Sequence, residues 1–182
     1  MNKSIFAAAL GALALISSSP AAVYTDVHDA ATFMAEFGDD KVLLRANGNP
    51  RSSYTNTFNI VDDGYVPGSG LSSATVTFWV HDQTRHELAD EIASVVLDGE
   101  WFSNSPSNLP FANVAFGGNL GLNLLLALEA NGTLSYTVTA VSGSLFLKRA
   151  ELTAVPDAGS TIMLLGLGLL GIIAARRRVQ SV

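Results

Sequence analysis

The sequence predicts an all-β fold, an antiparallel β-sandwich of jelly-roll-like or immunoglobulin-like type, with an apolar segment at each end of the chain. Apolar and polar residues alternate in several short segments between residues 42 and 153, as expected of strands buried on one face. Gly, Asn and Asp separate these segments at short intervals, as in hairpin-rich proteins. Seven to nine such strands in one domain are typical of a sandwich.

The N-terminus has the three parts of a secretory signal peptide. Lys3 supplies the positive charge, residues 5–16 form an apolar stretch of 12 residues, and Ser19-Pro20-Ala21 offers the small residues that signal peptidase reads. We therefore expect cleavage after Ala21. The predicted organisation is a signal peptide over residues 1–21, one domain over residues 22–154 and a C-terminal signal over residues 155–182.

The first part of the domain predicts one short helix and two strands. Asp29 is placed to cap a helix over residues 30–37. A strand is expected over residues 42–45, and the turn cluster Asn47-Gly48-Asn49-Pro50 separates it from a strand over residues 54–60. Residues 22–28 carry no clear pattern.

The clearest strand covers residues 74–80, where Ala, Val, Phe and Val alternate with Thr, Thr and Trp. Residues 92–97 are rich in β-branched side chains and end at Asp98-Gly99, a pair typical of hairpin turns. The chain is expected to resume pairing over residues 100–102.

Four further strands are predicted, over residues 114–116, 120–128, 134–141 and 145–153. Leucines at every second position from 122 to 128 favour a strand there, as do the glycines before it and the Asn131-Gly132 pair after it, which predicts a hairpin. The last predicted strand leads directly into the C-terminal signal.

The charge of the domain excludes some classes of function. Residues 22–154 hold 15 of the 16 acidic residues but only 6 of the 10 basic ones, a formal charge of −9 against −6 for the whole chain. A domain this acidic is not expected to bind nucleic acid through phosphate contacts. The chain has no cysteine, which excludes a disulfide framework and a thiolate metal site.

Acidic residues gather between Asp82 and Glu100, and three of them, Asp82, Asp90 and Asp98, are candidate calcium ligands because calcium takes oxygen donors from loops. The segment lacks the regular spacing of a calcium loop, so solvated turns are the alternative. Paired carboxylates of a glycoside hydrolase are a further alternative. No other cofactor is predicted.

Trp79 and Trp101 are candidate platforms for stacking a sugar ring, with a packing role as the alternative. No catalytic motif is complete: His86-Glu87 lacks the second histidine of a zinc protease, and there is no Gly-x-Ser-x-Gly elbow. We therefore predict a protein that is not an enzyme.

The C-terminus carries an apolar run of 14 residues, 162–175, followed by Arg176, Arg177 and Arg178. As a helix the run is about 21 Å long against about 30 Å of hydrocarbon. It spans a membrane only if residues 158–161 also enter and the arginines extend to the lipid headgroups. The predicted helix is thus residues 158–175, with the arginines as a cytoplasmic stop and the domain outside the cytoplasm.

This tail resembles the VPDSG-CTERM sorting signal, a relative of the PEP-CTERM signals of Gram-negative bacteria. The resemblance lies in Val155-Pro156-Asp157, in Gly159-Ser160-Thr161, in the Leu/Gly-rich helix and in the arginines; Ala158 stands where the family has Ser. It implies recognition by an exosortase, a cut near residues 155–159 and transfer from an inner-membrane intermediate to the cell surface or its exopolysaccharide matrix. Pro156 and Gly159 are expected to leave the motif extended and accessible.

These observations predict an exported structural or adhesive protein of the cell surface or matrix. A carbohydrate-binding module of the exopolysaccharide is the alternative, and a polysaccharide hydrolase that uses the carboxylates of residues 82–100 is a third.

Overall fold

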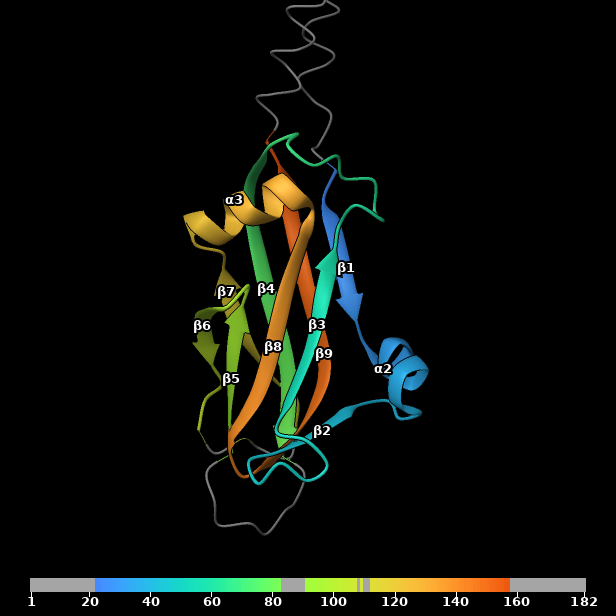
Figure 1. Ribbon diagram of the computed structural model, residues 1–182, viewed down its shortest axis with the longest axis vertical. Helices are drawn as coiled ribbons and strands as arrows, with labels where there is room; N and C mark the ends of the chain where they lie inside the picture. The colour runs from blue at the N-terminus through green and yellow to red at the C-terminus, as the bar shows by residue number, and fades with distance from the viewer. Residues whose placement is uncertain (1–21, 83–90, 108, 110–111, 158–182) are drawn as a thin grey trace, which may run out of the picture.

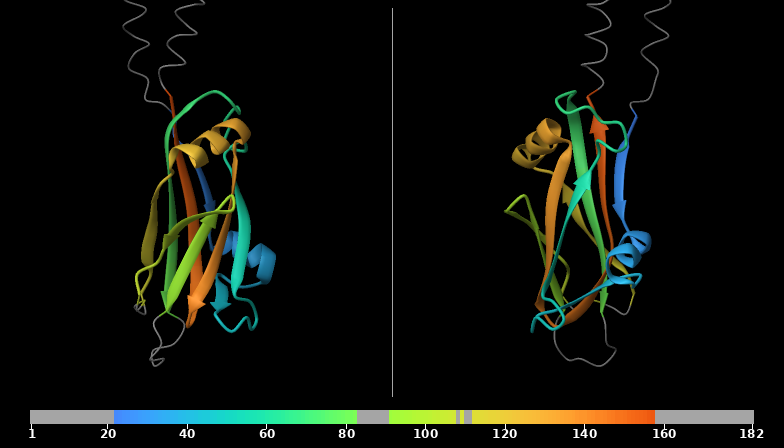
Figure 2. Two further views of the ribbon diagram at one scale, coloured as in Figure 1. Left: turned by 60° about the vertical axis from the view of Figure 1, so that its left-hand side comes forward. Right: turned by 45° about the vertical axis from the view of Figure 1, so that its right-hand side comes forward.

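Two antiparallel sheets face each other in this computed structural model, which describes residues 22–82, 91–107, 109 and 112–157 (Figure 1). The two layers are seen edge-on in Figure 2. In the five-stranded sheet the strands are β1 (Tyr24–His28), β9 (Ser144–Pro156), β4 (Leu71–Asp82) and β7 (Val114–Asn119) in spatial order, with β2 (Val42–Arg45) also on β9. In the four-stranded sheet the order is β3 (Ser53–Asn59), β8 (Thr133–Ser142), β5 (Ile92–Leu97) and β6 (Glu100–Asn104). The prediction of a β-rich antiparallel fold is confirmed.

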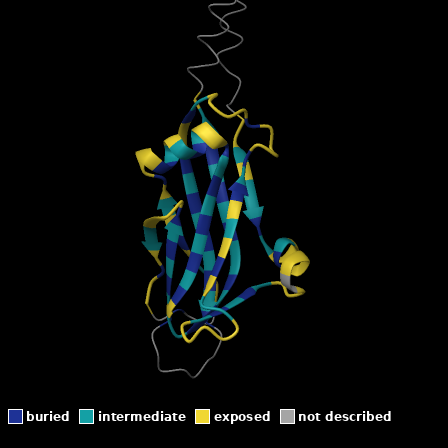
Figure 3. Cartoon of the chain, viewed as in Figure 1, coloured by how far each residue is buried: buried dark blue, intermediate teal, exposed yellow. Residues whose placement is uncertain are grey.

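The alternation of the sequence becomes the alternation of burial along the strands (Figure 3). In β4, Val76, Phe78 and Val80 are fully buried, whereas the residues between them lie on the outer face of the sheet. Rings from both sheets meet at the centre: Tyr136 of β8 lies 4.6 Å from Phe58 and 5.5 Å from Phe78 between ring centroids. The core therefore sits between the sheets, as the alternation predicts.

Strand β9 is the hub of the five-stranded sheet. One of its edges pairs with β4 along nearly its whole length, and the other edge pairs with β1 and, further down, with β2. The strand continues through Pro156, two residues past the expected end of the domain at Ala154. The start of the C-terminal signal is therefore part of the sheet.

Helix α2 (Ala30–Phe37) forms where it was predicted, between β1 and β2. Asp29 caps it, since its Oδ1 accepts a hydrogen bond from the backbone N–H of Ala31 at 3.0 Å. Gly38 ends the helix in a left-handed conformation, and Phe33 is fully buried. Strand β1, for which no pattern was seen, lies just before this helix and pairs with β9.

Residues 122–131 form a helix, α3 (Leu122–Asn131), so the prediction of a strand over residues 120–128 is wrong. Leu124 and Leu128, four residues apart, are buried, while Leu122 and Leu126 are 70% and 53% exposed. Gly132 is a helix C-cap and not a hairpin residue: its N–H donates to the carbonyl of Leu128 at 2.7 Å. Leucine favours helices, and burial of Leu124 and Leu128 on one face of the helix adds to that preference. The helix covers one end of the sandwich (Figures 1 and 2).

Within the described part of the chain, no helix combines the length and the apolar character needed to cross a membrane. The predicted signal peptide (residues 1–21) and membrane helix (residues 158–175) lie outside the described residues, as do Arg176, Arg177 and Arg178.

Candidate functional site on the outer face of the five-stranded sheet

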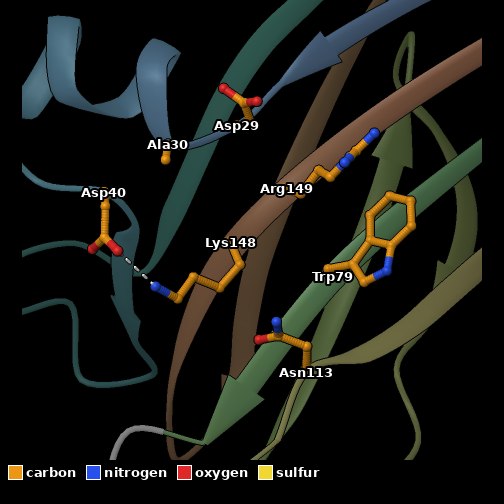
Figure 4. Close-up of a pocket in the computed structure, with 7 residues that line it drawn as sticks. All are labelled: Asp29, Ala30, Asp40, Trp79, Asn113, Lys148 and Arg149. Atoms are coloured by element: carbon orange, nitrogen blue, oxygen red, sulfur yellow. Dashed lines mark hydrogen bonds and ion pairs between the residues drawn. The ribbon is translucent and has the colours of Figure 1, made fainter.

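A shallow depression of about 410 Å³ lies on the outer face of the five-stranded sheet, away from the core. Several segments that are distant in sequence build it: the start of α2, the loop before β2, the outward face of β4, the residue before β7 and the middle of β9. Figure 4 shows the seven residues that line it, which are Asp29, Ala30, Asp40, Trp79, Asn113, Lys148 and Arg149.

A β-bulge places two cations side by side in this depression. Trp79 of β4 pairs with Arg149 of β9, but the next residue, Val80, pairs with Leu147, so Lys148 has no partner in the register. Lys148 and Arg149 consequently both lie on the outer face, while Leu147 remains buried. An extra residue in one strand redirects side chains in this way.

Arg149 lies over the indole of Trp79, with 5.1 Å between its guanidinium carbon and the ring centroid. A terminal nitrogen of Arg149 also donates to a carboxylate oxygen of Glu151. Its Nε is buried and finds no hydrogen-bond partner within the part of the chain that is described. The depression thus contains an indole with a guanidinium group packed over it, and that guanidinium is also paired with a carboxylate.

Lys148 is tied to the loop before β2. Its Nζ donates to Oδ2 of Asp40 at 3.1 Å (Figure 4). The Nζ of Lys41 lies 3.3 Å from the other oxygen of Asp40. The hydrogen bond from Lys148 is the largest of the causes that lower the pKa of Asp40 to about 2. Asp40 is therefore a carboxylate at neutral pH, and the depression carries charges of both signs.

The arrangement suits the binding of a polar ligand. Aromatic, amide, ammonium and carboxylate groups surround an open surface, as in sites that combine stacking with hydrogen bonding. Among the described residues there is no group of three or more His, Asp or Glu side chains that could hold a metal ion.

The structure does not bring Trp79 and Trp101 together. Trp101 belongs to the edge strand β6 of the opposite sheet, pairs with Val96 and is 68% exposed. The two indoles therefore lie on opposite outer faces of the sandwich, and they cannot share one ligand as small as a few sugar rings.

The acidic residues singled out in the sequence are also separated. Asp82 ends β4 beside Leu145 at the β8–β9 hairpin and is buried, whereas Asp98 lies at the far end of β5, beside Ser135. Asp98 and Gly99 form the predicted turn: both have positive φ, and Oδ1 of Asp98 accepts from the N–H of Ser135 at 2.9 Å. Asp90 lies outside the described residues, as do His86 and Glu87.

A second polar group lies inside the sandwich, where β1 meets β3 and β8. Nδ1 of His28 is 2.7 Å from the hydroxyl oxygen of Tyr136, and its ring stacks on Phe58. On the next strand, the hydroxyl of Tyr54 donates to Glu36 at 2.8 Å. Burial lowers the pKa of His28 and raises the pKa of Tyr54 to about 12. The His28 ring and the Tyr54 hydroxyl are therefore uncharged at neutral pH, and their hydrogen bonds, to Tyr136 and to Glu36, stabilise the core.

The C-terminal motif is divided between the fold and the chain beyond it. Val155 and Pro156 are paired with β4, and the N–H of Asp157 donates to the carbonyl of Gly70 at 3.1 Å. The expectation that Val155 and Pro156 are open is therefore wrong, because they are held in a sheet. Gly159, Ser160 and Thr161 lie outside the described residues.

Sequence reasoning missed Lys148, Arg149, Asp40 and Asn113 as neighbours of Trp79. One signal was present: two consecutive charged residues, Lys148-Arg149, interrupt the alternation of the last strand. Such an interruption indicates a bulge. The loop residues Asp40 and Asn113 carry no comparable signal.

Comparison with known proteins identifies the C-terminal segment. Residues 154–179 match the VPDSG-CTERM motif, which confirms the resemblance seen in the tail. No curated protein matches the chain in sequence.

Several solved structures resemble the domain distantly. A β-glucosidase from Paenibacillus barengoltzii is 13% identical over 62% of this chain, with a TM-score of 0.35, and the latent apple tyrosinase is 10% identical over 65%, with a TM-score of 0.46. This chain covers only 10% and 28% of those two proteins. The C-terminal domain of EclA, a sugar-binding protein, is 12% identical over 62% of this chain and 76% of its own length, with a TM-score of 0.43. At these TM-scores the resemblances carry no argument about function.

Proposed function

We propose that this chain is an exported structural or adhesive protein of the cell surface or extracellular matrix, sorted by an exosortase and not itself an enzyme. The observation that carries the proposal is the VPDSG-CTERM motif at residues 154–179, which begins within the last strand of a folded β domain. The domain, an immunoglobulin-like or jelly-roll-like sandwich, is the delivered part. Signal peptidase removes residues 1–21, and the tail holds an inner-membrane intermediate until the exosortase acts.

Mass spectrometry of the protein from cells that possess and cells that lack the exosortase tests this function. We expect tail peptides beyond residue 161 to be absent from the surface-located protein in the first cells and to persist in the second. A tail that persists equally in both would overturn the proposal. A triple variant that replaces Arg176, Arg177 and Arg178 by Gln is expected to reduce processing, because the cytoplasmic stop is lost.

The depression around Trp79 favours a second candidate function, the binding of exopolysaccharide. The flat indole can stack on a sugar ring, and the ammonium group of Lys148, the terminal guanidinium nitrogens of Arg149 and the amide of Asn113 can bond its hydroxyl or carboxylate groups. Because the depression is shallow and open, it suits one segment of a long polymer better than an enclosed small molecule. A surface protein with such a site would be retained in the matrix after sorting.

Affinity electrophoresis in gels that contain one acidic or one neutral polysaccharide tests the binding candidate. Trp79→Ala is expected to abolish any retardation, and Trp101→Ala, which removes the more exposed indole of the opposite sheet, serves as the matched control. Retardation lost only in Trp101→Ala would move the site to the other face. Equal mobility of all variants in every gel would overturn the binding candidate.

A further inference from the structure

The first three residues of the sorting motif are built into the folded domain. Val155 and Pro156 are the last residues of β9 and pair with Ser73 and Leu71 of β4. Beyond them, the N–H of Asp157 donates to the carbonyl of Gly70 at 3.1 Å. The sheet thus continues into the motif, with no linker between them.

A side chain reinforces this pairing. The register of β4 shifts between Leu71 and Ser73, which leaves Ser72 as an extra residue without a partner in the register. Its hydroxyl oxygen lies 3.1 Å from the carbonyl oxygen of Val155 and 3.3 Å from that of Pro156. The Ser72 hydroxyl therefore donates one hydrogen bond that is shared between the carbonyls of Val155 and Pro156, in addition to the backbone bonds.

The start of β4, which pairs with Val155 and Pro156, is itself held firmly in the fold. Leu71 is buried in the core, with 7% of its surface exposed, and β4 is an interior strand between β7 and β9. On the other side of β9, Tyr24 of β1 pairs with Ala154. Residues 154–157 can therefore leave the sheet only if this end of the domain opens.

A protease or transpeptidase binds its peptide as an extended strand whose backbone groups are free to pair with the enzyme. Backbone groups that already bond within a sheet cannot do this without local unfolding. From this we infer that the folded domain protects the peptide bonds up to Pro156–Asp157 and confines the sorting cut to bonds on the C-terminal side of Asp157. The delivered protein then keeps Val155 and Pro156 at the end of β9, with Asp157 directly after them.

This inference rests on the proposed processing by an exosortase, and the C-terminal peptide of the delivered protein tests both. We expect a last residue at Asp157 or later. A last residue at Ala154, Val155 or Pro156 would overturn the inference while leaving the sorting function intact. A full-length tail in cells with the enzyme would instead overturn the proposed function, and the inference with it.

An insertion of Gly-Ser-Gly-Ser between Ala154 and Val155 separates the motif from the sheet and keeps its sequence. If the sheet confines the cut, the released motif is expected to be cut at additional bonds before Asp157. An unchanged cut site would show that the enzyme alone selects the bond and would overturn confinement by the fold.

Endoproteinase Asp-N, which cuts before aspartate, probes the Pro156–Asp157 bond without the sorting enzyme. We expect the full chain in detergent to resist cleavage at this bond. Ser72→Ala is expected to raise the rate of cleavage there about fivefold, because one hydrogen bond that holds the segment in the sheet is lost. Ser73→Ala, an exposed neighbour, is the matched control and should behave as the unaltered protein. Equal rates in Ser72→Ala and Ser73→Ala, or rapid cleavage of the unaltered protein, would overturn the inference.

Discussion

Nδ1 of His28 lies 2.7 Å from the hydroxyl oxygen of Tyr136, in the interior of the sandwich. Nε2 of the same ring faces Asp26, with 3.6 Å to its Oδ2. We assign the proton of the neutral ring to Nε2, because a carboxylate can only accept, so the hydroxyl of Tyr136 donates to Nδ1. A second proton on the ring would have to displace this hydrogen bond.

We expect the free energy of unfolding to decrease as the pH falls from about 7.5 to about 5, because a histidine in the unfolded chain gains its proton near pH 6.5. Burial lowers the pKa of His28 against the opposing effects of Asp26, Glu36 and Asp29. The unfolded state therefore binds more protons in this range, and acid favours it. Urea denaturation at several pH values measures the slope of the free energy of unfolding against pH.

His28→Asn tests the assignment, since it keeps an acceptor near Tyr136 but does not titrate. The slope is expected to flatten in this variant and to persist in the control His81→Asn, whose histidine lies on the outer face of β4. Equal slopes in His28→Asn and the unaltered protein would contradict the assignment.

Leu128→Ala is expected to lower the free energy of unfolding by about 2–5 kcal/mol, the range for a large buried side chain replaced by Ala. Leu128 is a fully buried residue of α3. Leu126→Ala, with a 53% exposed side chain, should change it by less than about 0.5 kcal/mol. Denaturation of both variants in urea checks the helix directly, because in a strand the two leucines would share one face and respond alike.

Gly117→Ala is expected to destabilise the domain by about 3 kcal/mol or to prevent folding, owing to backbone strain and a direct clash. Gly117 has a φ of +142°, and a Cβ there would lie 2.1 Å from the carbonyl oxygen of Val76. Its neighbour Gly118 has open space around it, so Gly118→Ala is the matched control and should fold normally. Circular dichroism melts compare the stability of the two variants. Similar melting temperatures would contradict the close approach of β4 and β7.

The carboxyl group of Asp40 is expected to titrate with a pKa of about 2. Because Lys148 is the largest cause of this lowering, Lys148→Gln should raise the pKa toward the ordinary aspartate value more than Lys41→Gln does. Carbon-detected NMR of the Asp40 carboxyl group measures this pKa in the unaltered protein and in both variants. A larger effect of Lys41→Gln would contradict the geometry of the depression.

The sequence predicts best those elements that are determined by residues close together in the chain. Residues 74–80 alternate without interruption, and the structure places them within β4. Asp29 begins α2 and Gly38 ends it, each through a hydrogen bond to a residue within about one helical turn. Strand β1 was missed because it is held by a partner more than a hundred residues away, in the register Tyr24 to Ala154.

The leucine segment shows why spacing alone misleads. Leucines at positions 122, 124, 126 and 128 fit a strand face, but they also place two leucines on each side of a helix. Burial of Leu124 and Leu128 against the end of the sandwich decided between the two. The depression around Trp79 could not be predicted, because it depends on a bulge and on loops that meet only in the folded chain.

The position of β9 also sets the order in which the chain can fold. Strands β1, β2 and β4 all pair with β9, and β9 is the last described strand in the sequence. A chain that is threaded N-terminus first through a narrow translocon cannot close this sheet until its final strand has emerged, since contacts distant in sequence form late. In the proposed export, the fold is therefore completed only as the sorting motif arrives at the membrane, and a chain that stalls midway has neither a finished domain nor an available sorting motif.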